Sequence, residues 1–346
     1  DGLIETVAVG KSRLNYPLID GKVVGCPSHL LEPLRTNLIT NSEQFVDAPI
    51  GNTNMDLFSG AITNNDTTSP NGNVTAMKFT IGGTNSSLLR IYQSDLSTSS
   101  DNTFSIYAKK GTANSLSIDI TDVTVVNSIL TDEWQRIRVT NISTSSKFID
   151  VEVLGNVGEY IYIFGLQLEQ ASYATSYIPT INSAVTRVAE TANGAGDAST
   201  FNDSEGVLMA EISALSNEAG YKLISISDGS VQNQITIGIS DVSNNLYVDS
   251  KIGNITAISN GAFPANQQTF NKLLVKYKSG SNSIYLNGFK IDSNTNTFTP
   301  IGNQLDEFKF SYYTNTLQFY GNTKQIQYFD SALNDSDLEK ITSWTS

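Results

Sequence analysis

Short stretches in which apolar and polar residues alternate recur along the chain from about residue 75 onward. A period of two is typical of strands that bury one face, and parallel sheets would need amphipathic helices between the strands. The first group of these stretches therefore predicts an antiparallel sandwich, with strands over 104–108, 116–120, 134–139, 148–153 and 160–164.

A second group follows a break in this pattern. Residues 181–203 are rich in small and turn-forming residues and show no periodicity, as expected of a domain linker. Alternation then returns at 207–212, 222–226, 234–239 and 272–277. The later part of the chain therefore predicts a second antiparallel sandwich.

Two local signals point to particular elements. Asn287 and Gly288 lie between two alternating segments, and this pair tolerates the positive φ angles of a type I′ hairpin turn. Near the end of the chain, Asn334 precedes Asp335 and Asp337, so we expect it to cap a short helix whose first turn carries acids.

The first 35 residues follow neither pattern. Pro17, Pro27 and Pro33 interrupt any regular element, so we expect an extended N-terminal arm that packs on the first sandwich or on a neighbouring subunit. The chain begins at Asp1 rather than at a methionine, and we expect it to be a piece of a longer protein.

The predicted fold is all-β, with two jelly-roll sandwiches in tandem and a short C-terminal helix. Its parts are an arm at 1–35, a sandwich at 36–180, a linker at 181–203 and a jelly roll at 204–346.

Composition and charge narrow the classes of function. Hydrophobic residues make up 39% and charged residues 16% of the chain, a balance typical of β-rich extracellular or virion proteins. Lys and Arg total 21 against 34 Asp and Glu, and the net charge of −13 repels nucleic-acid phosphates and anionic membranes. Cys26 is the single cysteine, which excludes a disulfide within the chain, and no apolar run approaches the roughly 20 residues of a membrane span. We therefore expect neither nucleic-acid binding nor membrane insertion.

Several motifs resemble known families. The segment 31–45, the triplet Trp134-Gln135-Arg136 and the run 172–180 resemble the carbohydrate-binding-like module of phage fibre and head-spike proteins. The turn at 286–288 and the segment 328–335 are similar to those of a laminin-G-like, concanavalin-type jelly roll. The resemblance implies a virion-surface setting; it implies no activity, because sandwiches host binding, catalysis and scaffolding alike.

Residues suited to catalysis are scarce. His29 is the single histidine and lies near Cys26 in the arm, where we interpret both as local packing rather than as a base and a nucleophile. One histidine and one cysteine cannot make the usual zinc ligand sets. Glycoside hydrolysis could instead use two carboxylates, but Glu211 and Glu307 are each isolated in the sequence. We therefore expect no enzymatic activity.

Calcium is the metal to consider, because related sugar-binding sandwiches often hold it with carboxylates between their first and last strands. Here the first strand offers Glu43 and Asp47, whereas the last strand has no acid at positions 164 and 165. Asp228 and Asp249 could contribute oxygens in the second sandwich, but Asp-Gly is more often a turn. We assign no metal ligand and no cofactor.

Sugar binding requires an aromatic face and hydrogen-bonding groups, which 15 tyrosines and abundant asparagines can supply. In an extended segment, Tyr312 and Tyr313 would point to opposite sides, so at least one ring is expected at the surface. The alternative is that one of them covers the core. Tyr312, Tyr313 and Asn315 are the predicted ligand-binding residues.

The sequence thus predicts a non-enzymatic protein of the virion surface, in a phage head spike or tail fibre, that contacts host or environmental glycans. Its expected partners are other virion proteins or copies of itself. The first alternative is a carbohydrate-binding adhesin that a bacterium secretes or carries on its surface. The second alternative is a polysaccharide-degrading enzyme.

Overall fold

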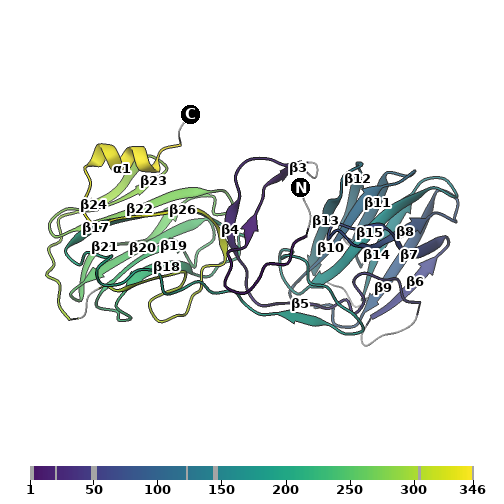
Figure 1. Cartoon of the computed structure of the whole chain (residues 1–346), viewed down its shortest axis with the longest axis horizontal. Coiled ribbons are helices and arrows are strands. Elements are labelled where there is room, and N and C mark those ends of the chain that lie inside the picture. Colours follow the sequence, from purple (N-terminus) through teal and green to yellow (C-terminus); the bar gives the residue numbers. More distant parts are fainter. Residues whose placement is uncertain are drawn as a thin grey trace. The chain divides into compact units, whose positions relative to one another are not determined.

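In the computed structural model, the described residues are 4–19, 22–47, 53–121, 124–142, 147–302 and 305–344. Across these ranges the chain forms antiparallel sheets and a single short helix, which confirms the predicted all-β class (Figure 1). The chain divides into two compact units. The first contains residues 1–11, 16–26 and 34–189, and the second contains residues 12–15, 27–33 and 190–346.

The first unit is a sandwich of two five-stranded sheets. Its sandwich strands are β6 (Thr53–Phe58), β7 (Ala61–Thr68), β8 (Val74–Thr80), β9 (Ser86–Gln93), β10 (Asp101–Lys110), β11 (Ser115–Ile120), β12 (Thr124–Ile129), β13 (Gln135–Ile142), β14 (Phe148–Leu154) and β15 (Tyr160–Glu169). One sheet has the order β13-β10-β15-β8-β7 and the other β12-β11-β14-β9-β6. Alternate residues such as Ile106, Ile118 and Ile163 are fully buried in one core between them.

Two short pairs complete the first unit. β2 (Leu18–Ile19) pairs with β3 (Lys22–Val23), and β5 (Arg35–Asn37) pairs with β16 (Val185–Arg187). Part of the expected linker is therefore a strand of the first unit.

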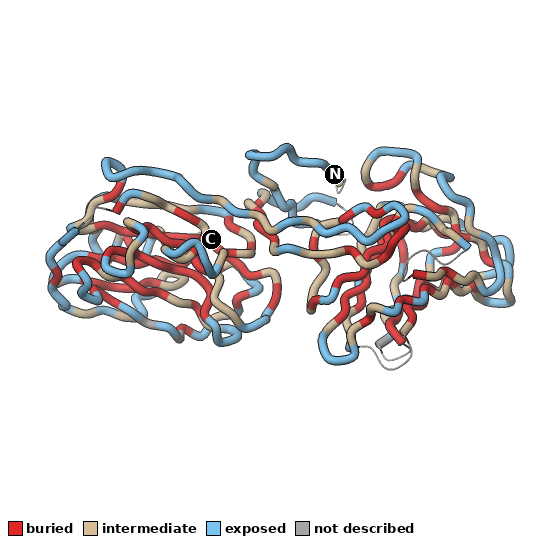
Figure 2. Tube along the Cα trace, turned by 90° about the horizontal axis from the view of Figure 1, so that it is seen from below, coloured by how far each residue is buried: buried red, intermediate tan, exposed pale blue. Residues whose placement is uncertain are grey.

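The second unit packs a seven-stranded sheet on a five-stranded sheet. Its strands are β1 (Leu14–Asn15), β4 (Ser28–Leu31), β17 (Glu205–Ala214), β18 (Lys222–Ser227), β19 (Gln234–Ile239), β20 (Asn245–Ile252), β21 (Ile255–Pro264), β22 (Asn271–Lys278), β23 (Asn282–Leu286), β24 (Phe289–Asn294), β25 (Glu307–Lys309) and β26 (Gly321–Phe329). The sheet orders are β1-β4-β26-β17-β22-β23-β24 and β21-β20-β19-β18-β25. Figure 2 shows that buried stretches of the chain run through each unit.

Both specific local predictions are confirmed. Asn287 and Gly288 join β23 to β24 with φ angles of 50° and 92°, the left-handed values that a type I′ turn requires. Helix α1 (Asp335–Thr342) begins after Asn334, whose side chain accepts a hydrogen bond from the backbone N–H of Asp337. Leu338 anchors the helix against buried residues of β17, β22 and β23, so α1 covers the outer face of the seven-stranded sheet.

The N-terminal segment differs from the arm expected on the first sandwich. β4 pairs with β26, and β1 pairs with β4, so both strands extend the seven-stranded sheet of the second unit. The prediction that these residues pack on the first sandwich is therefore wrong. The physical reason is that β26 needs a partner at its edge, and β4 supplies one while burying Leu30 and Leu31. Residues 190–203 also belong to the second unit, where Ala195 exchanges backbone hydrogen bonds with Phe308. The alternation of apolar and polar residues along the chain does not predict which distant segments pair.

Candidate functional site

The outer face of the five-stranded sheet in the second unit carries polar side chains that are nevertheless buried. The isoleucines of β18 and β19 point to the core, which turns Gln234, Thr236 and Ser225 to the opposite face. The strand register places Thr236 between Ser225 on β18 and Asp249 on β20. All four side chains are buried, so another segment covers this hydrogen-bonding face.

That covering segment is a turn that begins at Tyr312. The backbone N–H of Tyr312 donates to the carbonyl of Thr316, and the N–H of Asn315 donates to the carbonyl of Tyr312, both at 2.9 Å. The side-chain amide of Gln234 donates to the phenol of Tyr312 at 3.4 Å and to Oδ2 of Asp249 at 3.2 Å. These bonds attach the turn to β19 and β20.

The two predicted tyrosines lie side by side. The ring centroids of Tyr312 and Tyr313 are 4.3 Å apart with an interplanar angle of 56°, and both residues are half-buried. The rings would point to opposite sides only in an extended segment, and the chain turns here instead. Asn315 is exposed in the left-handed region, with φ at 58°, and its side-chain oxygen accepts a hydrogen bond from Nζ of Lys309 at 3.3 Å.

Two tyrosines that the sequence analysis missed complete an aromatic cluster. The rings of Tyr221 and Tyr247 meet edge to face, with centroids 5.1 Å apart. Burial raises the pKa of Tyr247, and the nearby Asp249 carboxylate and Tyr312 phenol add to the effect. Burial also raises the pKa of Tyr221 and of Tyr313, and Tyr312 contributes to both shifts. The phenols of Tyr221, Tyr247 and Tyr313 therefore stay protonated at neutral pH and can donate as well as accept hydrogen bonds.

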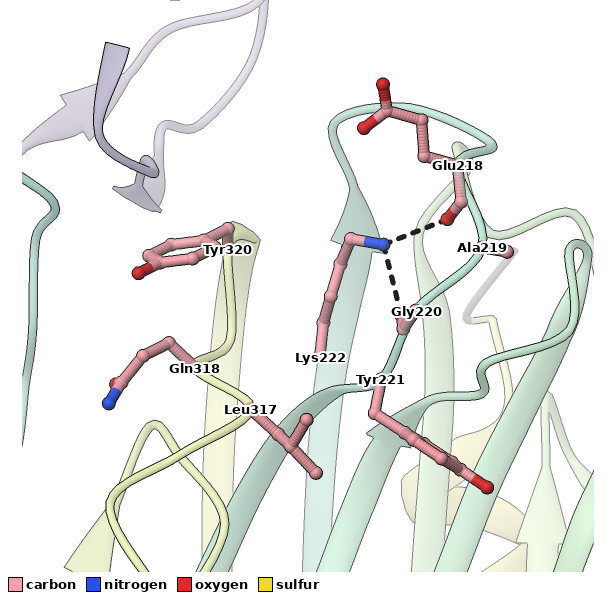
Figure 3. A pocket seen from close by; sticks show the side chains of 8 residues that line it. All are labelled: Glu218, Ala219, Gly220, Tyr221, Lys222, Leu317, Gln318 and Tyr320. Carbon is pink, nitrogen blue, oxygen red and sulfur yellow. Dashed lines mark hydrogen bonds between the residues drawn. The ribbon is translucent and has the colours of Figure 1, made fainter.

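A hollow of about 390 Å³ opens beside this cluster (Figure 3). The loop 218–221 bounds one side of it, and Leu317, Gln318 and Tyr320 bound the other. The ammonium of Lys222 donates to the carbonyls of Glu218 at 3.0 Å and of Gly220 at 3.2 Å, which closes the loop. Tyr221 lines the hollow and also contacts Tyr247, so the hollow and the aromatic cluster share this residue.

Two carboxylates on this sheet face lie beside cations. Oδ2 of Asp249 lies 3.9 Å from Nζ of Lys251, and Oε2 of Glu307 lies 2.7 Å from Nζ of Lys309. Burial raises the pKa of Asp249, although Lys251 opposes the shift. The site thus offers aromatic rings, amides and hydroxyls, and two further acids belong to it: Glu218 lines the hollow, and Asp241 lies beside Tyr221.

Metal coordination has no visible basis in the ranges that the structure describes. There, no group of three or more His, Cys, Asp or Glu side chains gathers. Oδ1 of Asp228 accepts hydrogen bonds from the backbone and hydroxyl of Ser230, so this Asp-Gly pair forms a turn.

The other groups weighed for catalysis are not among the residues that make up this site. His29 is part of β4, where its ring meets Phe310 at 5.5 Å, while Cys26 is exposed in the first unit. Glu211 lies on β17 of the seven-stranded sheet, with its Oε1 at 3.6 Å from Nζ of Lys324. None of the helices among the described residues is long and apolar enough to cross a membrane.

Comparisons with known proteins concern the fold. No family model matches the sequence. No curated protein matches it either. Among solved structures, the chain is similar to the CBM40 module of the Ruminococcus gnavus IT-sialidase bound to α2,6-sialyllactose, with 14% identity and a TM-score of 0.37 over 44% of this chain and 94% of that one.

Two further solved structures are similar. Domain 4 of AbnA, a GH43 extracellular arabinanase from Geobacillus stearothermophilus in complex with arabinotriose, matches with 13% identity and a TM-score of 0.34 over 46% of this chain and 73% of that one. Domains LG4-5 of the mouse laminin α1 chain match with 12% identity and a TM-score of 0.29 over 72% of this chain and 88% of that one. Similarity at this level leaves the function to be argued from the chain's own residues.

Proposed function

We propose that this chain is a non-enzymatic surface protein that binds glycans through the tyrosine-lined face of its second unit. The observation that carries the proposal is the cluster of Tyr221, Tyr247, Tyr312 and Tyr313 beside a hollow and over a row of amide and hydroxyl groups. Sugar rings present apolar C–H faces and equatorial hydroxyls, so aromatic rings and neutral hydrogen-bonding groups suit them.

The chemistry of the same residues disfavours catalysis. Acid–base hydrolysis of a glycoside requires two carboxyl groups that face one bond. Asp249 and Glu307 are paired with Lys251 and Lys309, while Glu218 lines the hollow and Asp241 lies beside Tyr221. A binding role needs no such groups, and many weak sites on one particle would bind a surface strongly together.

The proposed setting is the surface of a phage particle, as part of a head spike or tail fibre, in contact with other virion proteins or with copies of itself. The resemblance of segments 31–45 and 172–180 to phage fibre and spike modules supports this setting. A bacterial adhesin would use the same site in the same way. Labelling this protein on source particles in electron micrographs distinguishes the two settings.

The binding site is tested with an array of neutral oligosaccharides, followed by titration of the oligosaccharides that bind. Tyr312→Ala and Tyr313→Ala should each weaken binding about fivefold, since one aromatic contact contributes about 1 kcal/mol. Tyr16→Ala, at an exposed tyrosine of the first unit, is the matched control and should leave the affinity unchanged. If both site variants bound with unchanged affinity, the tyrosine cluster would not be the glycan-binding site. Release of sugar products by the wild-type protein would overturn the non-enzymatic assignment.

A further inference from the structure

The outer face of the β13-β10-β15-β8-β7 sheet in the first unit carries a concentration of basic side chains. The register places Lys78, Tyr162 and Lys109 in one row across β8, β15 and β10. The next row runs from Phe164 through Tyr107 to Arg136 on β13. Neither row contains an acid.

A fourth cation extends this group. Arg138 lies two residues beyond Arg136 on β13, so both side chains are on the same face. It pairs in register with Ser105 and is exposed. Neighbouring strands lie about 4.8 Å apart, so the four cations share a patch only a few strands wide. We call Lys78, Lys109, Arg136 and Arg138 the basic face.

Among the residues that the structure describes, these four cations have no carboxylate partner. Within the described ranges none of them forms an ion pair, although acids outnumber bases in the whole chain. Arg136 donates to the carbonyl of Thr175 at 2.7 Å and to the hydroxyl of Ser105 at 2.9 Å, which fixes its position without neutralising its charge. Lysines of the second unit show the contrast, since Lys278 is paired with Glu205 at 2.7 Å.

Aromatic rings lie among the cations. Nζ of Lys78 lies 4.3 Å from the ring centroid of Tyr160, and the guanidinium of Arg136 lies 5.3 Å from that of Tyr107. The rings of Tyr160 and Tyr162 meet at 5.3 Å. Burial, with a contribution from Tyr160, raises the pKa of Tyr162 to about 12, so its hydroxyl stays protonated.

None of three nearby acids forms an ion pair with these cations among the described residues. Glu169 is fully buried and accepts hydrogen bonds from Gln167 and Thr175. The carboxylate of Glu43 accepts a hydrogen bond from the Tyr177 phenol at 3.1 Å. Asp66 is close enough to Tyr162 to influence its pKa and is the acid at the edge of the patch.

We propose that the basic face is a second glycan site, specific for a polysaccharide whose sugar units carry carboxylates. Uncompensated like charges repel one another, and a bound anion relieves that repulsion. Guanidinium groups match carboxylates in geometry, and the tyrosines supply ring faces and hydroxyl donors for the sugars. The negative charge of the rest of the chain disfavours the denser charge of nucleic acid.

This site is independent of the tyrosine cluster in the second unit, so the two proposals can fail separately. The probe is polygalacturonate, titrated into the full chain by calorimetry, with uncharged dextran as the neutral comparison. We expect binding of polygalacturonate that weakens as salt rises from about 0.01 M to about 1 M, because salt screens the charges. Tyr312→Ala should leave this binding unchanged.

Three variants make the test specific. The double substitution Lys78→Gln with Lys109→Gln should weaken polygalacturonate binding about tenfold, and Arg138→Gln should weaken it about threefold, in the range of exposed ion pairs. Lys11→Gln removes an exposed charge of the first unit elsewhere and should have no effect. An unchanged affinity of the double variant, or equal binding of uncharged dextran, would overturn the proposal. If dextran sulfate bound more tightly than polygalacturonate, the basic face would recognise sulfate rather than carboxylate groups. If single-stranded DNA bound more tightly, the ligand would be a nucleic acid rather than a glycan, and the proposal would be wrong.

Discussion

The side-chain amide of Gln234 and the phenol of Tyr312, 78 residues apart in the chain, are joined by a hydrogen bond of 3.4 Å. Gln234 is fully buried and lies on β19, while Tyr312 begins the turn that covers this strand. The bond therefore holds the tyrosine pair against the sheet face that the turn covers.

Tyr312→Phe separates this anchoring role from ring contact with a sugar. We expect the variant to destabilise the second unit by about 0.5–1.5 kcal/mol, the net value of one hydrogen bond, and to keep most glycan binding. Denaturant unfolding measures the first effect, and titration of an oligosaccharide that binds the wild-type protein measures the second. If Tyr312→Phe lost binding as fully as Tyr312→Ala, the hydroxyl rather than the ring would be the sugar contact.

Arg90 and Asp150 form a forked ion pair across β9 and β14 of the first unit. Nε donates to Oδ1 at 2.7 Å and Nη2 to Oδ2 at 2.6 Å, and the guanidinium lies 3.9 Å from the ring centroid of Phe148. Arg90→Lys cannot make both bonds, so it should lower the stability of the first unit by about 1–2 kcal/mol. Thermal unfolding of the full chain measures the loss. Arg138→Lys, at an exposed site, is the control, and an equal loss in the two variants would contradict the argument.

Glu43 predicts a dependence of stability on pH. Burial raises the pKa of Glu43 above its ordinary value of 4.5, although the Tyr177 hydrogen bond opposes the shift. The folded state therefore holds this proton more tightly than the unfolded state, and the resulting stability is present below pH 4.5 and lost as pH rises through the folded-state pKa. Glu43→Gln should exceed the wild-type protein in unfolding midpoint at neutral pH, and the difference should disappear in acid.

Unfolding midpoints across the pH range check this prediction. Glu133→Gln, which changes an exposed glutamate of the same unit, should show no such trend. A Glu43→Gln variant that was less stable than the wild-type protein at neutral pH would show that the carboxylate is stabilising.

The β4–β26 pairing predicts that the second unit is incomplete without N-terminal residues. A fragment of residues 190–346 leaves the edge of β26 open and removes the cover that Leu30 and Leu31 provide. Adding a peptide of residues 12–33 should raise its unfolding midpoint by about 5 °C, because each leucine buried contributes up to a few kcal/mol. Calorimetry of the fragment with and without peptide measures this.

A peptide in which Leu30 and Leu31 are both changed to Ser is the matched control and should not stabilise the fragment. If residues 204–346 alone were as stable as the fragment with peptide, the second unit would end where the sequence pattern restarts, and β4 would be dispensable.

The fold class and several elements follow from short-range pattern. Alternation in segments such as 104–108 and 234–239 requires only that one face of each strand be buried, and it located β10 and β19. The Asn287-Gly288 turn and the Asn334 cap depend on the conformations of one or two residues, so adjacent sequence is enough to identify them.

Only the tertiary structure decided which distant segments meet. Tyr221, directly before β18, meets Tyr247 of β20, and Tyr312 reaches them because a turn brings it over β19. The sequence marked Tyr312, Tyr313 and Asn315 as candidates but left the directions of the two rings open, because it could not show that the backbone turns there. The physical reason is the same for β4: hydrogen bonds and burial between residues far apart in the chain depend on how the whole sheet is assembled, and no local spacing encodes that arrangement.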